Sequence, residues 1–258
     1  MKASELQIRQ DLAAAYRLAD FFGFSEGIDN HLTVSLPGEE DKYLLIPYGL
    51  HWSEVTASSL IVVDGNGKKV SGEGYAEPTA FLIHGAVHNA SEKNKCVMHT
   101  HMLSALTITM QDKGRLLMGD QNACRFYDDI FYLDDYEGLV LDKETAQPIG
   151  DACKENNIVF LANHGVIVTG QTVHEAWESL YYLEKACKAQ NTAMSTGKKI
   201  NSINGQIAKK VSMQVKEEAQ SESANAYRHF EALKRVLIKN GNKDFLDCLL
   251  YTSPSPRD

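Results

Sequence analysis

Apolar residues recur along this chain with two different periods. A spacing of three or four residues favours an amphipathic helix, and short apolar runs that end at Gly, Pro or Asn favour buried strands. The helical pattern covers residues 4–22, 78–90, 103–110, 172–194 and 208–239. The strand-like runs are 31–36, 43–46, 59–63, 68–70, 95–101, 157–162 and 166–169.

Turn and capping residues fix several of these boundaries. Pro78 suits the first turn of a helix, where its missing N–H is not needed. Thr172, followed three residues later by Glu175, forms a capping box. Residues 64–67 read DGNG, a turn that predicts a hairpin. Because the elements are mixed and no repeat or long linker separates them, we expect a single α/β domain over residues 1–247.

The composition is that of an ordinary globular protein, with 43% hydrophobic and 23% charged residues among 258. The 34 acidic and 26 basic residues give a formal net charge of -8, which argues against nucleic acid or an anionic membrane as a partner. No apolar run approaches the roughly 20 residues of a membrane-spanning helix. The N-terminal segment is charged throughout, unlike a signal peptide, and the five cysteines are scattered. We therefore expect a cytoplasmic protein.

The last eleven residues differ from the rest of the chain. Residues 248–258 read CLLYTSPSPRD and resemble a translated sequencing adapter. We interpret them as a non-native tail, against the alternative of a short Ser/Pro-rich native terminus, and exclude them from the expected fold.

Histidines supply the strongest chemical signal. His99 and His101 are two apart in the strand-like string CVMHTHM, so both side chains point the same way and can share one metal ion. His164, in the string NHG after another apolar run, is the candidate third ligand. Three protein ligands leave a coordination position open, as in catalytic zinc sites. We expect Zn²⁺, with Mn²⁺, Fe²⁺ or Co²⁺ as alternatives.

His84 and His88 form a competing pair. They are four residues apart on the helix predicted over 78–90 and share one face of it. Because no third donor lies nearby in the sequence, we expect satisfied or surface histidines there, with His84 as a candidate to support the metal ligands through hydrogen bonds.

The histidine spacing and several longer strings together resemble the class II aldolase/adducin family. The strings are GIDNHLTV at 27–34, IPYGLHWSEVTASSLIVVD at 46–64, DQNACRFYDDI at 120–130 and WESLYYLEKACKAQ at 177–190. The resemblance covers residues 8–247 and points to the adducin-like bacterial branch. It implies an αβα layered domain around a central, largely antiparallel sheet, and a homotetramer with the active site at a subunit interface.

The same resemblance implies a chemistry. Family enzymes hold a divalent metal through histidines that match His99, His101 and His164. They cleave or epimerise sugar phosphates through an enediolate, and others are decarboxylases. A Lewis-acidic metal suits such reactions because it stabilises the negative charge that develops as a C–C bond breaks.

Two departures from the aldolase pattern affect catalysis. Where sugar phosphate aldolases place a catalytic Glu, this chain has Ala80, which cannot transfer a proton. Glu77 is our candidate general base, the alternative being a carboxylate that merely favours the helix N-terminus. Tyr127 is the first candidate proton donor and Tyr132 the second, although aromatic residues in RFYDDIFYLDDY also suit core packing.

The elements that grip phosphate in the family are altered as well. Gly27, Asn30 and Gly49 are retained and are the candidate substrate-binding residues, or alternatively turn residues. Tyr48 and Pro78 stand where hydroxyl residues are expected. An unphosphorylated hydroxy or keto substrate is therefore as consistent with the sequence as a sugar phosphate.

Three functions are compatible with these residues. The first is a metal-dependent lyase of carbohydrate metabolism that performs retro-aldol cleavage or decarboxylation of a small hydroxy or keto substrate. The second is a non-catalytic, adducin-like oligomeric scaffold of the cytoskeletal type. The third is a sugar-phosphate epimerase. The histidine triad favours the first function, and the missing carboxylate at position 80 weakens it.

Overall fold

An eight-stranded sheet forms the centre of the computed structural model, which describes residues 3–39, 41–219 and 225–247. The strand order is β4-β3-β2-β1-β5-β8-β7-β6, and all neighbouring strands are antiparallel except β6 and β7. The strands are β1 (His31–Ser35), β2 (Lys42–Leu45), β3 (Ile61–Asp64), β4 (Lys69–Ser71), β5 (Cys96–Thr100), β6 (Ile130–Leu133), β7 (Ile158–Leu161) and β8 (Gly165–Gly170).

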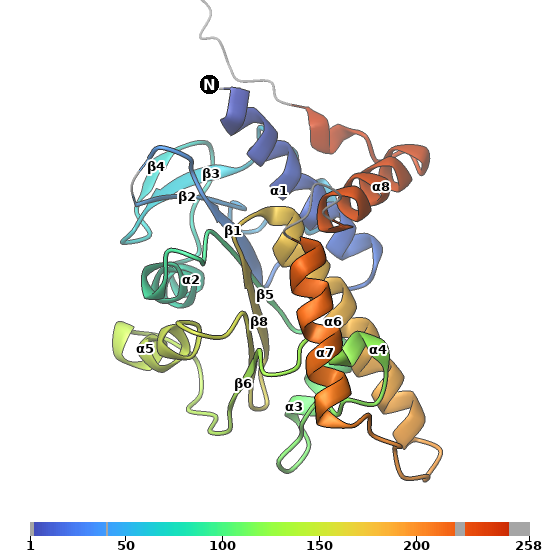
Figure 1. Cartoon of the computed structure of the whole chain (residues 1–258). Coiled ribbons are helices and arrows are strands. Elements are labelled where there is room, and N and C mark those ends of the chain that lie inside the picture. The colour runs from blue at the N-terminus through green and yellow to red at the C-terminus, as the bar shows by residue number, and fades with distance from the viewer. Residues whose placement is uncertain (1–2, 40, 220–224, 248–258) are drawn as a thin grey trace, which may run out of the picture.

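Helices cover both faces of this sheet (Figure 1). On one face, α2 (Pro78–Ala90) packs beside α5 (Lys143–Ala152). The helices on the other side are α1 (Ala3–Phe21), α3 (Leu103–Thr109), α4 (Gln121–Cys124), α6 (Val173–Met194), α7 (Gly205–Ala219) and α8 (Asn225–Lys239). Two 3₁₀ turns, η1 (Trp52–Glu54) and η2 (Asp244–Leu246), pack against α1. This arrangement confirms the expected αβα fold around a largely antiparallel sheet.

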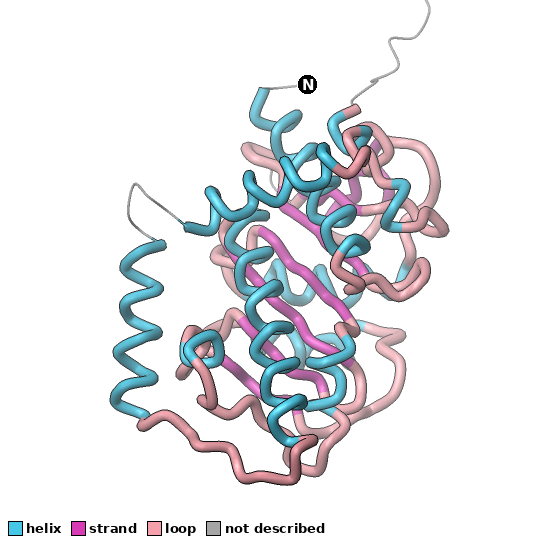
Figure 2. The backbone as a smooth tube through the Cα atoms, turned by 90° about the vertical axis from the view of Figure 1, so that its right-hand side faces the viewer, coloured by secondary structure: helices cyan, strands magenta, loops and turns pink. Residues whose placement is uncertain are grey.

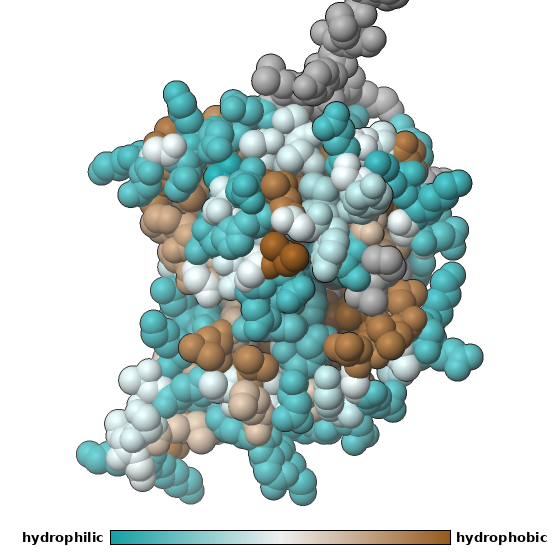
Figure 3. Space-filling model, turned by 180° about the vertical axis from the view of Figure 1, so that it is seen from behind, coloured by the Kyte–Doolittle hydropathy of each residue, from teal (hydrophilic) through white to brown (hydrophobic). Residues whose placement is uncertain are grey.

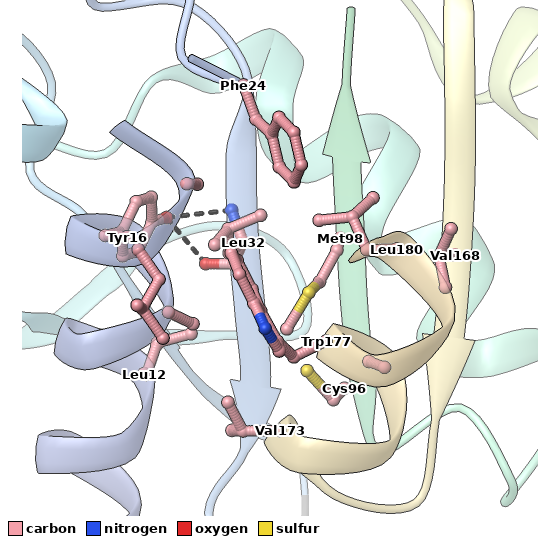
Figure 4. Close-up of a cluster of buried hydrophobic side chains, with 14 of the residues drawn as sticks. Leu12, Tyr16, Phe24, Leu32, Cys96, Met98, Val168, Val173, Trp177 and Leu180 are labelled. Carbon is pink, nitrogen blue, oxygen red and sulfur yellow. Dashed lines mark hydrogen bonds between the residues drawn. The ribbon is translucent and has the colours of Figure 1, made fainter. Parts of the chain in front are cut away.

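Apolar side chains fill the space between the sheet and α1 and α6 (Figure 4). Tyr16, Leu32 and Trp177 are fully buried there. The Tyr16 hydroxyl donates to the Leu32 carbonyl (2.6 Å) and accepts from the Leu32 N–H (2.8 Å). Because β1 pairs with β2 only from Val34 onward, Tyr16 satisfies backbone groups that the neighbouring strand leaves open.

Alternation along β1 and β5 decides which side chains face α2. The register places His31 opposite His99 and Thr33 opposite Val97. Val97 belongs to the smaller apolar core under α2 and α5. Because paired residues and residues two apart share a face, His31, Thr33 and His99 also face α2. Polar side chains are therefore gathered at one end of this face of the sheet.

Most predicted elements are present, and three parts of the prediction need correction. The helix predicted over 208–239 is wrong as a single element, because α7 and α8 run in different directions (Figure 2); residues 220–224 lie outside the described part. Strand β6 and helices α4 and α5 have no counterpart in the prediction. β6 is only partly buried and therefore lacks a clear apolar alternation, whereas α5 carries Pro148, a residue that disfavours a helix interior.

Within the described residues, no helix combines the length and apolar character needed to cross a membrane. The surface seen from behind carries separate apolar patches among hydrophilic groups (Figure 3). The cysteines of the described part are unpaired and buried; they are Cys96, Cys124, Cys153 and Cys187. The tail predicted to be non-native, 248–258, lies outside the described residues.

Candidate metal centre and its cavity

Three histidines from two places in the sheet face one another. His99 lies on β5, His101 follows the end of that strand, and His164 lies in the turn between β7 and β8. The distances between ring centroids are 5.0 Å for His99 and His101, 4.8 Å for His99 and His164, and 4.9 Å for His101 and His164. One nitrogen of each ring lies within 4.8 Å of the others. The structure thus brings together the three ligands predicted from the sequence.

The backbone around His164 explains how this turn reaches β5. Asn163 has a positive φ of 55°, a conformation that Asn tolerates better than most residues and that reverses the chain sharply. A Cβ on Gly165 would lie 2.6 Å from the Thr100 carbonyl oxygen and 2.7 Å from the His101 ring. Only glycine therefore allows β8 to start this close to His101.

Hydrogen bonds orient two of the three rings. His99 Nδ1 is 3.0 Å from the Val166 carbonyl oxygen, which can only accept, so this nitrogen carries the proton. His101 Nδ1 is 2.5 Å from a carboxylate oxygen of Glu26. In the neutral form of each ring Nε2 is then the unprotonated nitrogen, and His101 Nε2 is buried without a partner among the described residues. A carboxylate or carbonyl behind a histidine is the usual support of a metal ligand.

Burial keeps His99 and His164 neutral. The pKa of His99 is well below its usual range because the ring is desolvated and lies beside His164 and His101. Burial lowers the pKa of His164 to about 4, with His101 adding to the effect. Neutral imidazole is the form that binds a metal, so the donor set fits a divalent cation such as Zn²⁺.

A cavity of about 500 Å³ opens beside the three histidines. Its wall contains Glu77, Asn30 and Tyr48, together with His31 and His84. Another side is formed by residues 136 and 138–141, which follow β6. A small organic molecule of a few carbon atoms fits a space of this size.

The remaining candidate residues fall in different places. Glu77 and Asn30 line the cavity, as a base and a substrate-binding residue would. Gly27 and Gly49 do not line it; they have φ of 59° and 90° and open space where a Cβ would stand, which favours turn positions. The side chains of residues 78–80, including the Ala80 position, lie outside the described part.

The tyrosine prediction needs revision. Tyr127 does not line the cavity of its own chain: a Cβ on Gly205 of α7 would lie 3.1 Å from its hydroxyl. Tyr132 is directed elsewhere, because its hydroxyl accepts from the Leu116 N–H at 3.0 Å. Tyr136 lies close to the triad, with its ring centroid 6.5 Å from that of His164, and it lines the cavity. No period or spacing along the chain distinguishes Tyr136 from its aromatic neighbours.

Sequence reasoning also missed His31 and Glu26. His31 is opposite His99 in the register, and burial lowers its pKa to about 4. It could have been found by pairing the strand at 31–36 with the strand at 95–101. Glu26 lies 75 residues from His101, in a turn with no motif, so only the fold reveals their contact.

The comparison with known proteins agrees with this geometry. Residues 10–191 match the model of the class II aldolase and adducin N-terminal domain. The chain belongs to the class II aldolase/adducin family. It is 35% identical over 208 residues to the "Putative aldolase class 2 protein" of Pseudomonas aeruginosa, covering 80% of this chain and 79% of that protein. It is 34% identical to mouse alpha-adducin over 198 residues, which cover 75% of this chain but 26% of adducin.

Solved structures of this family superpose well. An aldolase II superfamily protein from Pseudomonas syringae has a TM-score of 0.88 and 31% identity, covering 96% of this chain and 98% of that chain. The L-fuculose 1-phosphate aldolase from Glaciozyma antarctica has a TM-score of 0.77 and 25% identity, covering 92% of each chain. Class II aldolases generally use a divalent metal, often zinc, and the histidine triad is the group that could hold it here.

Proposed function

We propose that this protein is a metal-dependent lyase that cleaves or decarboxylates a small hydroxy or keto substrate. The observation that supports this most strongly is the convergence of His99, His101 and His164 at the wall of a cavity that also contains a carboxylate. These three rings would hold a Zn²⁺ ion, which would supply the Lewis acidity that C–C bond cleavage next to a carbonyl or hydroxyl group needs.

Glu77 is the proposed proton-transferring residue. Glu77 is half-buried and lines the cavity, and its negative charge acts on the nearby His31. A carboxylate in this position can take a proton from a substrate hydroxyl and thereby start the cleavage. Tyr136 replaces Tyr127 in our proposal as the proton donor, since it lines the same cavity.

The cavity lining favours an unphosphorylated substrate. Among the described lining residues there is no Lys or Arg to balance a phosphate, whereas Asp29 and Glu77 both contribute carboxyl groups. Asn30, Tyr48 and the histidines suit hydroxyl and carbonyl groups. Gly27 and Gly49 retain their proposed roles only as turn residues that shape the rim.

We further propose that copies of this chain assemble around the site as a homotetramer, in the cytoplasm. Apolar side chains are exposed at the cavity rim, with Leu139 at 77% and Leu141 at 65% exposure. Apolar groups this exposed beside a binding site are typical of a protein interface. The buried, unpaired cysteines fit a reducing compartment.

The test combines metal content with turnover. Purified protein should contain about one zinc per chain and should cleave or decarboxylate at least one member of a panel of short hydroxyketones, hydroxy acids and keto acids. Glu77→Ala should lower kcat about 10²- to 10⁴-fold with the metal retained, since the proton transfer is lost. Glu73→Ala is the matched control: this exposed carboxylate does not line the cavity and its loss should leave kcat unchanged.

A non-catalytic scaffold is the second candidate, favoured by the likeness to alpha-adducin. Zinc-loaded protein that turns over no member of the panel, in its assembled state, would support the scaffold and contradict the lyase. Interconversion of sugar phosphate epimers without cleavage would instead identify an epimerase.

A further inference from the structure

A chain of hydrogen bonds runs from a backbone carbonyl to the cavity behind the metal ligands. His88 Nδ1 lies 2.6 Å from the Asn94 carbonyl oxygen. His88 Nε2 and His84 Nδ1 each lie 2.7 Å from the same Thr33 hydroxyl oxygen. The series of hydrogen bonds ends at His84 Nε2, a buried nitrogen that has no partner among the described residues. His84 itself lines the cavity.

The carbonyl at one end fixes the direction of every bond. A carbonyl oxygen only accepts, so His88 Nδ1 carries the proton. Both rings are neutral, because burial lowers the pKa of His88 to about 4 and holds that of His84 well below its usual range. His88 Nε2 must then accept the single hydroxyl proton of Thr33, and Thr33 in turn accepts from His84 Nδ1. His84 Nε2 is left with a lone pair and no proton.

An acceptor of this kind calls for a donor. His84 is only 1% exposed, and a buried polar atom without a hydrogen bond is unfavourable. His84 is not part of the group of rings whose nitrogens converge for a metal. A ligand hydroxyl in the cavity would supply the missing hydrogen bond.

We propose that His84 is a substrate-binding residue of this cavity, whose Nε2 accepts a hydrogen bond from a substrate hydroxyl, and that Thr33 and His88 are positioning residues that fix its tautomer. This inference rests on the proposed function. It implies that the substrate carries a hydroxyl group in addition to the oxygens that a metal would attract.

The tautomer can be measured without any ligand. Long-range ¹H–¹⁵N spectra of ¹⁵N-histidine-labelled protein, with His84 assigned by its loss in His84→Phe, should show a protonated Nδ1 and an unprotonated Nε2. Thr33→Val should abolish this pattern, and Thr33→Ser should preserve it because it keeps the hydroxyl. A wild-type His84 protonated at Nε2 would overturn the proposal, whether or not the Thr33→Val variant folds.

Binding of two hydroxamates to zinc-loaded protein tests the role in recognition. Acetohydroxamate and glycolohydroxamate present the same metal-chelating group and differ by one hydroxyl. Calorimetry should show that the wild type prefers glycolohydroxamate about threefold to tenfold, the range expected for one neutral hydrogen bond. The preference should fall to about one in His84→Phe and Thr33→Val, with zinc content unchanged. It should persist in Thr169→Val, where the removed hydroxyl has no partner among the described residues.

The outcomes separate this inference from the lyase proposal. If both hydroxamates bind equally to wild-type protein, or if the preference survives in His84→Phe, the role of His84 is wrong while the metal site stands. If the zinc-loaded protein binds neither compound, the proposed function itself fails, and the assignment of His84 fails with it.

Discussion

Two groups of histidines lie on the α2 face of the sheet, and their hydrogen bonds are arranged in different ways. In the triad of His99, His101 and His164 the three rings converge, and His99 and His101 are each held from behind by a separate acceptor. In the second group, His84 and His88 are joined in series through Thr33. The first arrangement directs several lone pairs to one point, and the second delivers one lone pair to the cavity wall.

The difference separates two tasks that a histidine can perform. Convergent lone pairs suit a cation, because several donors share one charge. Side chains joined in series suit a single hydrogen bond of fixed direction, because the hydrogen bond of each side chain determines which atom of the next one carries the proton. Residue type alone does not distinguish these cases, because positions 84 and 88 hold two histidines on one face of a helix just as positions 99 and 101 hold two on one face of a strand.

Removal of the three triad histidines should have the largest effect, a complete loss of zinc binding. The combined substitution of His99, His101 and His164 by Ala should abolish zinc binding, since no ring of the triad is left. His84→Ala, on the serial chain, should still bind about one zinc per chain. Atomic emission analysis of dialysed protein checks both variants. Stoichiometric zinc in the triple variant would show that the two groups have been assigned the wrong way round.

Acid should destabilise the metal-free protein steeply. The pKa of His31 and of His88 falls from 6.5 to about 4 on folding, because both rings are buried. Below pH 6.5 the unfolded chain binds protons that the folded chain does not, so stability falls as pH decreases, until about pH 4. Each ring contributes about 1.4 kcal/mol per pH unit over this interval. Urea unfolding at pH 7, 6 and 5 measures the slope. A midpoint independent of pH would contradict neutral burial.

Loss of the support behind His101 should have a smaller effect on the triad. Glu26→Gln removes the carboxylate that accepts from His101 Nδ1, and zinc affinity should fall about 10- to 100-fold. Glu54→Gln is the control, because Glu54 accepts from the His51 N–H outside the cavity. Competition with a fluorescent chelator gives both affinities. Equal affinities in the two variants would mean that Glu26 does not orient the ligand.

Loss of the Thr33 hydroxyl, which joins His84 and His88, should have the smallest effect, and it should be seen in the free energy of unfolding. Thr33→Val leaves nitrogens of His84 and His88 without their common partner and should lower the free energy of unfolding by about 1–3 kcal/mol. Thr169→Val removes an equally buried hydroxyl that has no partner among the described residues, so it should not destabilise. Chemical denaturation of both variants gives the comparison. Equal stability losses would argue that the hydroxyl of Thr33 joins nothing.

The sequence was informative where a local signal existed. The spacing of apolar residues and the positions of Gly, Pro and Asn predicted three elements of the site correctly. They are the strand with His99 and His101, the turn with His164 and the helix that begins at Pro78. β6 was not predicted, because it is a partly buried edge strand among acidic residues, and an exposed face has little apolar alternation. The prediction of a single helix over 208–239 was wrong, because the spacing of apolar residues does not reveal where one helix ends and the next begins in another direction.

The site shows the same limit. The three metal-binding histidines were predicted from their spacing and from the family resemblance. His31 and Thr33 acquire their roles only through the register of β1 with β5. Glu26 acquires its role only through its long-range contact with His101. The serial chain depends on hydrogen bonds between residues 51 and 55 positions apart. Such contacts belong to the tertiary fold, and a single sequence carries no local trace of them.

The parallel pairing of β6 with β7 has an evolutionary consequence. The segment that follows β6 walls the cavity, and α5 then leads the chain back to β7, so this wall is anchored at both ends by regular structure. The metal ligands come from other segments. Insertions or deletions within residues 134–141 can therefore alter the size of the substrate space while the histidine triad keeps its place, and relatives can diverge in substrate range without rebuilding the chemistry.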